Sequence, residues 1–139
     1  MLNSDDQLIM AVSRAKRIYV IGNGGSYANA AHLCNDFLSV GLRAYTLDSA
    51  TLSAFANDYG WDVAFARWLA VVGEPGDLLV ALSGSGRSPN ILNAIETAKE
   101  RGMYVHKIFG NERGEDMQQA EEAQLTLGHA VRLCLQPQN

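Results

Sequence analysis

The chain has 139 residues, of which 47% are hydrophobic and 19% are charged, and its net charge is −4. This length is typical of one ordinary domain, so residues 1–139 are expected to form a single domain. Acidic residues outnumber basic ones, and no basic run is longer than Lys16-Arg17, which argues against nucleic acid as a partner.

The polar start of the chain and the lack of 18 consecutive apolar residues argue against secretion and membrane spanning. Cys34 and Cys134 lie in apolar runs without metal-ligand spacing. Both are interpreted as reduced core thiols, and a cytoplasmic protein is expected.

Short apolar runs alternate with helical patterns along the chain. Strands are predicted at 17–21 (RIYVI), 44–47, 78–82 (LLVAL), 103–109 and 131–135 (VRLCL). Helices are predicted at 26–40, 61–72, 89–101 and 112–122. Such alternation predicts an α/β fold with a parallel sheet and helices on both faces. Ligands of such sheets bind beyond the carboxyl ends of the strands, so a binding site is expected in the loops that follow the strands.

The loop after the strand at 78–82, residues 83–88, is called the serine loop here. It offers hydroxyls at Ser83, Ser85 and Ser88, glycines that let the backbone approach a ligand, and the cation Arg87. Ser88 and Pro89 are expected at the N-cap and first position of the next helix. The free amides of that helix would then face the loop, which indicates a phosphate site, although a plain capped turn remains the alternative.

The loop after the first strand, residues 22–26, is called the glycine loop. Its Gly-Asn-Gly-Gly-Ser sequence approaches the dinucleotide fingerprint, with Asp48 available for a ribose hydroxyl. Tyr27 stands where the third glycine of that fingerprint is needed, which disfavours a nicotinamide cofactor.

The helix at 26–40 carries a polar edge formed by Gly25, Asn29, His32 and Asp36. His32 and Asp36 are four positions apart, so their side chains can share a proton, a hydroxyl or a divalent metal. A surface hydrogen-bonded pair is the alternative. A separate stripe is apolar, namely Ala30, Leu33, Cys34 and Phe37.

Four motifs together resemble the sugar isomerase (SIS) domain, and within it the phosphoheptose isomerase group. They are Ile21 to Ser26 followed by His32, Ala56-Asn57-Asp58-Tyr59-Gly60, Pro75 to Leu79, and Ser83 to Asn90. The resemblance implies a three-layer α/β/α, flavodoxin-like fold with a five-stranded parallel sheet in the order 2-1-3-4-5. It also implies a homo-oligomer, a dimer or tetramer, with active sites between subunits.

The resemblance further assigns residues to a site for an open-chain heptose phosphate. Substrate-binding positions would be Asn23, Gly24, Gly25, Ser26, Asn57, Asp58, Ser83, Gly84, Ser85 and Ser88. Catalytic residues would be His32 and Asp36, which would also be zinc ligands. Because two ligands are too few for a tight zinc site, further donors would come from substrate, water or a second subunit.

The sequence departs from the family pattern at several positions. Asp36 replaces a glutamate, Gly84 replaces a threonine, and Arg87 replaces an asparagine. The family's C-terminal Arg-Ile-Gln-Glu-x-His helix, whose Gln and His complete the site, finds no match, so this part of the site is expected to be missing. His106 and His129 are interpreted as structural.

The resemblance thus implies an aldose-ketose isomerase acting on sedoheptulose 7-phosphate through an enediol, with Asp36 as base and His32 as acid or metal ligand. The alternative is a non-catalytic SIS module that binds a phosphosugar or a protein partner.

Overall fold

The computed structural model describes residues 2–110 and 116–136 of the chain. Its described residues contain four strands: β1 (Ile18–Ile21), β2 (Ala44–Thr46), β3 (Leu78–Ser83) and β4 (Tyr104–Phe109). All pairs are parallel and the order is β2-β1-β3-β4. The predicted parallel sheet and the order of its first four strands are confirmed.

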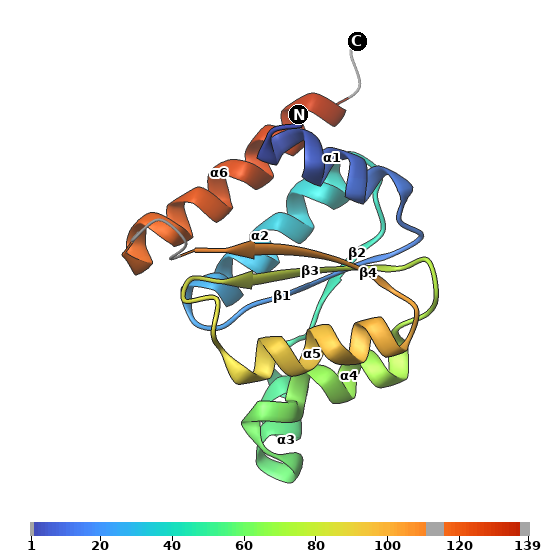
Figure 1. Ribbon diagram of the computed structural model, residues 1–139, viewed down its shortest axis with the longest axis vertical. Helices are drawn as coiled ribbons and strands as arrows, with labels where there is room; N and C mark the ends of the chain where they lie inside the picture. Colours follow the sequence, from blue (N-terminus) through green and yellow to red (C-terminus); the bar gives the residue numbers. More distant parts are fainter. Residues whose placement is uncertain (1, 111–115, 137–139) are drawn as a thin grey trace.

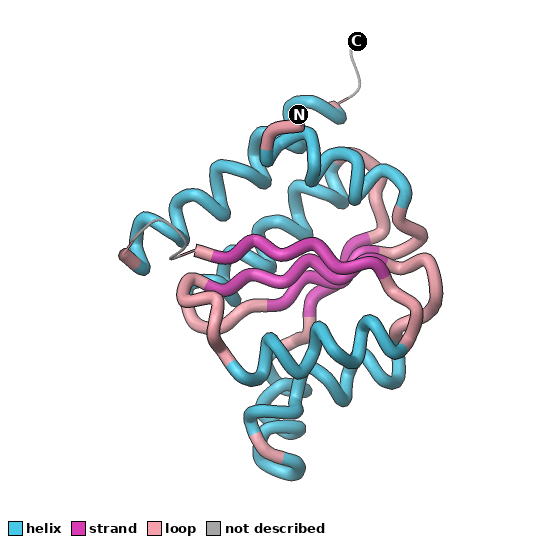
Figure 2. The backbone as a smooth tube through the Cα atoms, viewed as in Figure 1, coloured by secondary structure: helices cyan, strands magenta, loops and turns pink. Residues whose placement is uncertain are grey.

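Helices cover both faces of this sheet (Figure 1). One face carries α1 (Ser4–Arg14), α2 (Gly25–Ser39) and α6 (Met117–Leu135). The other carries α4 (Ala64–Val72) and α5 (Pro89–Glu100), from which α3 (Ser49–Tyr59) and the 3₁₀ turn η1 (Trp61–Val63) project. The tube in Figure 2 shows the sheet between the two helical layers, which confirms the three-layer prediction.

Residues of β1 show why this central strand is buried and apolar at every position. Ile18 and Val20 belong to the core under α1, α2 and α6, whereas Tyr19 and Ile21 belong to the core over α4 and α5. A strand buried on both faces needs apolar side chains at every position. The predicted apolar stripe of α2 is buried in the first of these cores.

The predicted fifth strand at 131–135 is wrong, because these residues form the last turns of α6. Val131 is fully buried while Leu133 is 72% exposed, so the apolar residues do not line a doubly covered strand. Only residues 110–116 separate β4 from α6. The helix predicted at 112–122 is found from Met117 onward, and residues 111–115 lie outside the described part of the chain.

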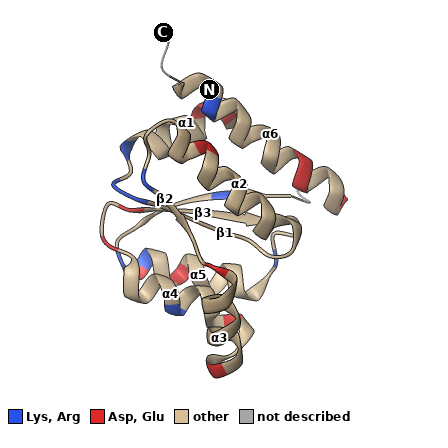
Figure 3. Ribbon diagram, turned by 180° about the vertical axis from the view of Figure 1, so that it is seen from behind, with Lys and Arg blue, Asp and Glu red and all other residues tan. Residues whose placement is uncertain are grey.

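Cys34 is buried as expected, but the interpretation of Cys134 as a core thiol is wrong, because it is exposed on α6. Basic and acidic positions are both spread over the described ribbon (Figure 3). None of the helices within 2–110 and 116–136 combines the length and apolar character of a membrane span.

Candidate functional site

The serine loop brings its three hydroxyls together at the carboxyl end of β3. The Oγ atom of Ser88 lies 3.4 Å from that of Ser83 and 3.5 Å from that of Ser85. Backbone amides of Gly86 and Arg87 donate to the hydroxyls of Ser83 and Ser85. A cluster of hydroxyls before the amino end of a helix suits the oxygens of an anion.

Ser88 is the N-cap of α5 and Pro89 its first residue, as predicted. The Ser88 side chain makes no capping hydrogen bond. Its hydroxyl therefore stays with the serine loop, where it is available to a ligand rather than committed to the helix terminus.

A reciprocal amide pair fixes the glycine loop against α5. Nδ2 of Asn23 donates to Oδ1 of Asn90, and Nδ2 of Asn90 donates to Oδ1 of Asn23, both at 2.8 Å. Asn90 is buried, so this pair satisfies polar atoms that burial would otherwise penalise. These hydrogen bonds therefore hold the glycine loop in a defined position relative to the start of α5, which directly follows the serine loop.

Helix α6 runs alongside α2 and meets its polar edge at successive turns. The Glu121 carboxylate covers Gly25 so closely that a Cβ there would collide with it. Gln124 is buried, donates from Nε2 to Ser26 Oγ at 3.0 Å, and accepts from Asn29 Nδ2 at 3.0 Å. The polar edge predicted on α2 is therefore largely covered by a second helix.

Further along, the same two helices form a cluster of two histidines and an aspartate. Nε2 of His32 lies 2.8 Å from Nε2 of His129, and Oδ2 of Asp36 lies 3.7 Å and 4.0 Å from these two nitrogens. The histidine side chains are about half exposed, whereas the Asp36 side chain is only 3% exposed. Oδ2 of Asp36 is buried without a hydrogen-bond partner among the described residues.

These three atoms fit the donor set that zinc requires. Zinc takes imidazole nitrogen and carboxylate oxygen at about 2.0–2.2 Å, and catalytic sites use three protein ligands with a fourth position open. The three donor atoms lie within 4.8 Å of one another. The unpartnered Oδ2 of Asp36 is a buried acceptor that a cation or a proton would satisfy.

The family model described as "SIS domain" matches residues 3–110. The chain belongs to the SIS domain family. It is 36% identical to a phosphoheptose isomerase from Burkholderia pseudomallei, with 91% of this chain and 75% of that protein covered. It is 37% identical to a phosphoheptose isomerase from Nitratidesulfovibrio vulgaris, with 78% of this chain and 56% of that protein covered.

Solved structures agree with this SIS domain assignment. The fold matches phosphoheptose isomerases from Neisseria gonorrhoeae, with a TM-score of 0.82 at 29% identity, and from Francisella tularensis, with 0.85 at 28% identity. The matches cover 95% and 94% of this chain, and 82% and 83% of those chains. The resemblance stated from the motifs is confirmed.

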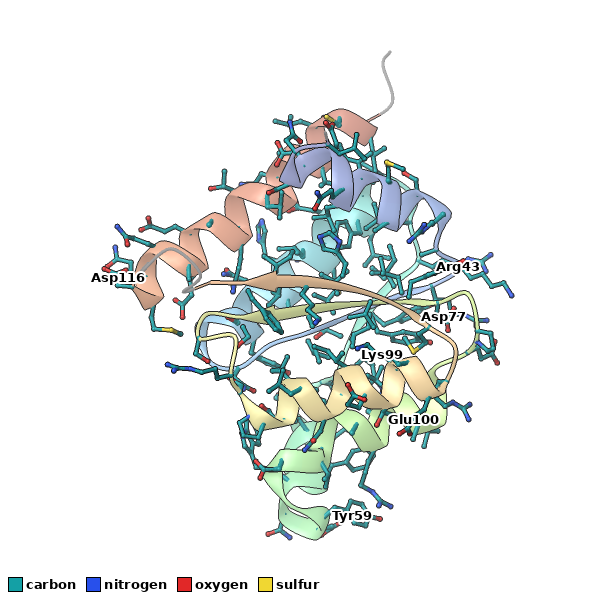
Figure 4. The ribbon with its side chains drawn as sticks, viewed as in Figure 1. Arg43, Tyr59, Asp77, Lys99, Glu100 and Asp116 are labelled. Carbon is teal, nitrogen blue, oxygen red and sulfur yellow. The ribbon has the colours of Figure 1, made fainter. Side chains whose placement is uncertain are left out.

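Two residues expected in the substrate site lie apart from it in this SIS domain. Asn57 and Asp58 are exposed near the end of α3, where Asn57 Nδ2 donates to Asp58 Oδ1. Figure 4 labels their neighbour Tyr59 at the tip of α3, which points away from the sheet. No hydrogen bond links either residue to the serine loop or glycine loop among the described residues.

The expectation that the chain lacks a C-terminal helix is wrong, because α6 is present, although its sequence does not contain the Arg-Ile-Gln-Glu-x-His motif. Helix α6 brings Gln124 and His129 to α2, and His129, interpreted as structural, lies 2.8 Å from His32. A signal was present in the sequence: Glu121, Gln124, Gly128 and Arg132 recur at three- and four-residue spacing and share one helix face. The strand predicted at 131–135 placed Arg132 outside any helix, so the sequence prediction did not include this helix face.

The structure also explains one departure from the family pattern and the role of Asp48. A Cβ at Gly84 would lie 2.5 Å from Cε of Met117, so the first turn of α6 occupies the space of the expected threonine side chain. The carboxylate of Asp48 accepts from the Thr51 amide as the N-cap of α3, and this hydrogen bond lowers the Asp48 pKa. Asp48 therefore has a structural role that needs no ribose.

Proposed function

We propose that this SIS domain is an aldose-ketose isomerase of the sedoheptulose 7-phosphate type, with residues 1–139 acting as a single domain. The names of the similar proteins support the activity, since the Burkholderia and Nitratidesulfovibrio relatives are phosphoheptose isomerases. The observation that carries the proposal is the buried Oδ2 of Asp36, which faces the imidazoles of His32 on α2 and His129 on α6.

In this proposal the serine loop holds the phosphate group of the open-chain sugar. Its hydroxyls at Ser83, Ser85 and Ser88, the backbone at Gly84 and the amino end of α5 supply donors, and Arg87 supplies positive charge. Of the glycine loop residues, Asn23 and Gly24 would contact the sugar chain, whereas Gly25 and Ser26 would shape the loop beneath Glu121 and Gln124 of α6.

Isomerisation moves a proton between C1 and C2. A base takes the proton from C1 of the ketose while an acid protonates the C2 oxygen, and the enediol then gains a proton at C2 and loses one from the C1 hydroxyl. Asp36 is assigned as the base and His32 as the acid. The 2.8 Å contact between His32 and His129 lets the two rings exchange a proton.

Zinc is the proposed cofactor, with His32, Asp36 and His129 as the residues that would hold it. An atom that binds the ion cannot act as acid or base at the same time, so the zinc-bound form is the alternative to the acid-base arrangement above. When bound, zinc would polarise the carbonyl oxygen and stabilise the negative charge that develops on it.

We further propose that the enzyme works as a cytoplasmic homo-oligomer, a dimer or tetramer. Asn57 and Asp58 stand on α3 away from the serine loop, so they would complete the site of a neighbouring subunit. Tyr59 and Trp61 are about half exposed beside them, as expected for residues that another subunit covers. Cysteines without disulfides are usual in a reducing compartment.

The test is to incubate the purified protein with sedoheptulose 7-phosphate, with and without Zn²⁺, and to follow formation of the aldose. Asp36→Asn should reduce turnover, and Ser85→Ala should weaken substrate binding. Ser53→Ala, at an exposed serine of α3, is the matched control and should behave like the unmodified protein.

A non-catalytic phosphosugar-binding module would give a different result. It would show no turnover above background, but the substrate would raise its melting temperature, and Ser85→Ala would abolish that shift. Turnover that Asp36→Asn leaves unchanged would contradict the assigned base.

A further inference from the structure

The two carboxylate oxygens of Asp36 have different surroundings. Oδ1 lies 3.8 Å from Nη1 of Arg132, whereas Oδ2 faces the imidazoles of His32 and His129. Rotation about the last side-chain bond would exchange the two oxygens, and that torsion is broad for aspartate. A group that engages one oxygen therefore decides which oxygen faces the histidines.

Arg132 reaches Asp36 because α6 approaches α2 closely at Gly128, one turn earlier. A Cβ at Gly128 would lie 2.9 Å from Cγ of Leu33 and 3.3 Å from Oδ2 of Asp36. Gly128, His129 and Arg132 thus supply, within about one turn, the space over Asp36, one imidazole and one guanidinium.

Among the described residues, Arg132 is the charged side chain within 4.0 Å of Oδ1 of Asp36, whereas the imidazoles of His32 and His129 lie on the side of Oδ2. The hydroxyl of Ser39 donates to the backbone oxygen of Asp36 rather than to its side chain. Arg132 is a suitable partner, since a guanidinium keeps its charge at all relevant pH values and presents several donors in a fixed plane. Its side chain is 49% exposed and contacts Asp36 from outside the cluster.

We propose that Arg132 is a positioning residue: by engaging Oδ1 it presents Oδ2 of Asp36 to the two imidazoles. It acts through Asp36 and does not contact the substrate. The inference rests on the proposed function, because it takes His32, Asp36 and His129 as the reaction centre. It also accounts for how an aspartate, one methylene shorter than the family glutamate, is kept in place.

The Zn²⁺ affinity of a variant without Arg132 distinguishes a positioning role of this residue from a purely electrostatic one. Removing a positive charge beside a cation site would by itself strengthen Zn²⁺ binding. Loss of a group that orients a ligand instead weakens metal binding, commonly by about 10- to 100-fold. The two effects have opposite signs in the same variant, Arg132→Gln.

The experiment measures Zn²⁺ affinity by competition with a chromophoric chelator, and kcat and KM for sedoheptulose 7-phosphate. Arg132→Gln is expected to bind Zn²⁺ about 10- to 100-fold more weakly, and to lower kcat while KM changes less than about twofold, because the substrate contacts remain. Arg132→Lys should recover part of both losses. Arg43→Gln, at an exposed arginine just before β2, is the control and should match the unmodified protein.

Unchanged or tighter Zn²⁺ binding by folded Arg132→Gln would overturn the inference. So would equal losses in the Lys and Gln variants together with equal drops in melting temperature, since Arg132 would then only pack. An unmodified protein without measurable Zn²⁺ affinity would overturn both this inference and the metal centre. Normal Zn²⁺ behaviour without any turnover would overturn the proposed activity alone.

Discussion

Nε2 of His32 and Nε2 of His129 lie 2.8 Å apart, although 97 positions separate the two residues in the chain. At this distance one ring nitrogen donates and the other accepts, so the pair holds at most one proton between these two atoms. This contact joins α2 to α6 at the polar edge that the sequence indicated only on α2.

His129→Ala is therefore expected to reduce kcat by about 100-fold or more, the range usual for loss of an acid-base group. Its melting temperature should stay close to that of the unmodified protein, because the side chain is about half exposed. Steady-state kinetics and a thermal melt check the two parts. Near-normal kcat in a folded variant would remove His129 from the reaction centre.

Gly128→Ala is expected to destabilise the protein by about 1 kcal/mol. Overpacking against Leu33, which is fully buried, costs about 1–3 kcal/mol, and better helix propensity returns about 0.5–1 kcal/mol. Gly84→Ala is the matched control, since its Cβ would meet only the end of the Met117 side chain, which is 53% exposed. Urea unfolding measures both, and equal stability of the two variants would contradict the close helix crossing.

His106 should make the protein less stable in mild acid. Burial lowers its pKa below the usual value of 6.5, so the unfolded chain binds the proton more readily than the folded one. The free energy of unfolding is then highest above about pH 6.5 and falls as the pH drops toward the folded pKa. His106→Gln should reduce the difference between urea unfolding at pH 7.5 and pH 5.5. An unchanged difference would contradict this assignment.

The two cysteines should differ in reactivity. Burial raises the pKa of the Cys34 thiol to about 12, whereas Cys134 is exposed. Because the thiolate is the reactive form, one thiol should react quickly with a disulfide reagent at pH 8, and the second only after unfolding. Cys134→Ser should abolish the fast phase. Rapid labelling of two thiols in the native protein would show that Cys34 is accessible.

The parts of the fold that the sequence predicted are those where local chemistry and burial agree. β1 and β3 are buried on both faces, so their uninterrupted apolar runs have one interpretation. Pro89 after Ser88 marks a helix start because its ring fits only the first turn. The apolar stripe of α2 follows the helical period, and its members are buried.

The errors lie where a short segment is ambiguous without its tertiary contacts. Residues 131–135 suit a strand or a helix by composition, and only packing against α2 decides for the helix. With that segment misassigned, the partners of His32 and Asp36 on α6 could not be found. The assignment of Asn57 and Asp58 to the substrate site stays a prediction, because their motif is clear but they make no hydrogen bond to either loop among the described residues.

Helix α6 is one continuous helix without proline, and it contacts both the serine loop and the histidine cluster. Its first turn packs Met117 on Gly84 and Ala120 on Gly110, and His129 follows about 18 Å further along the axis. The same helix therefore borders the serine loop with its first turn and carries His129 and Arg132 further along, so a substitution in that first turn can affect both places.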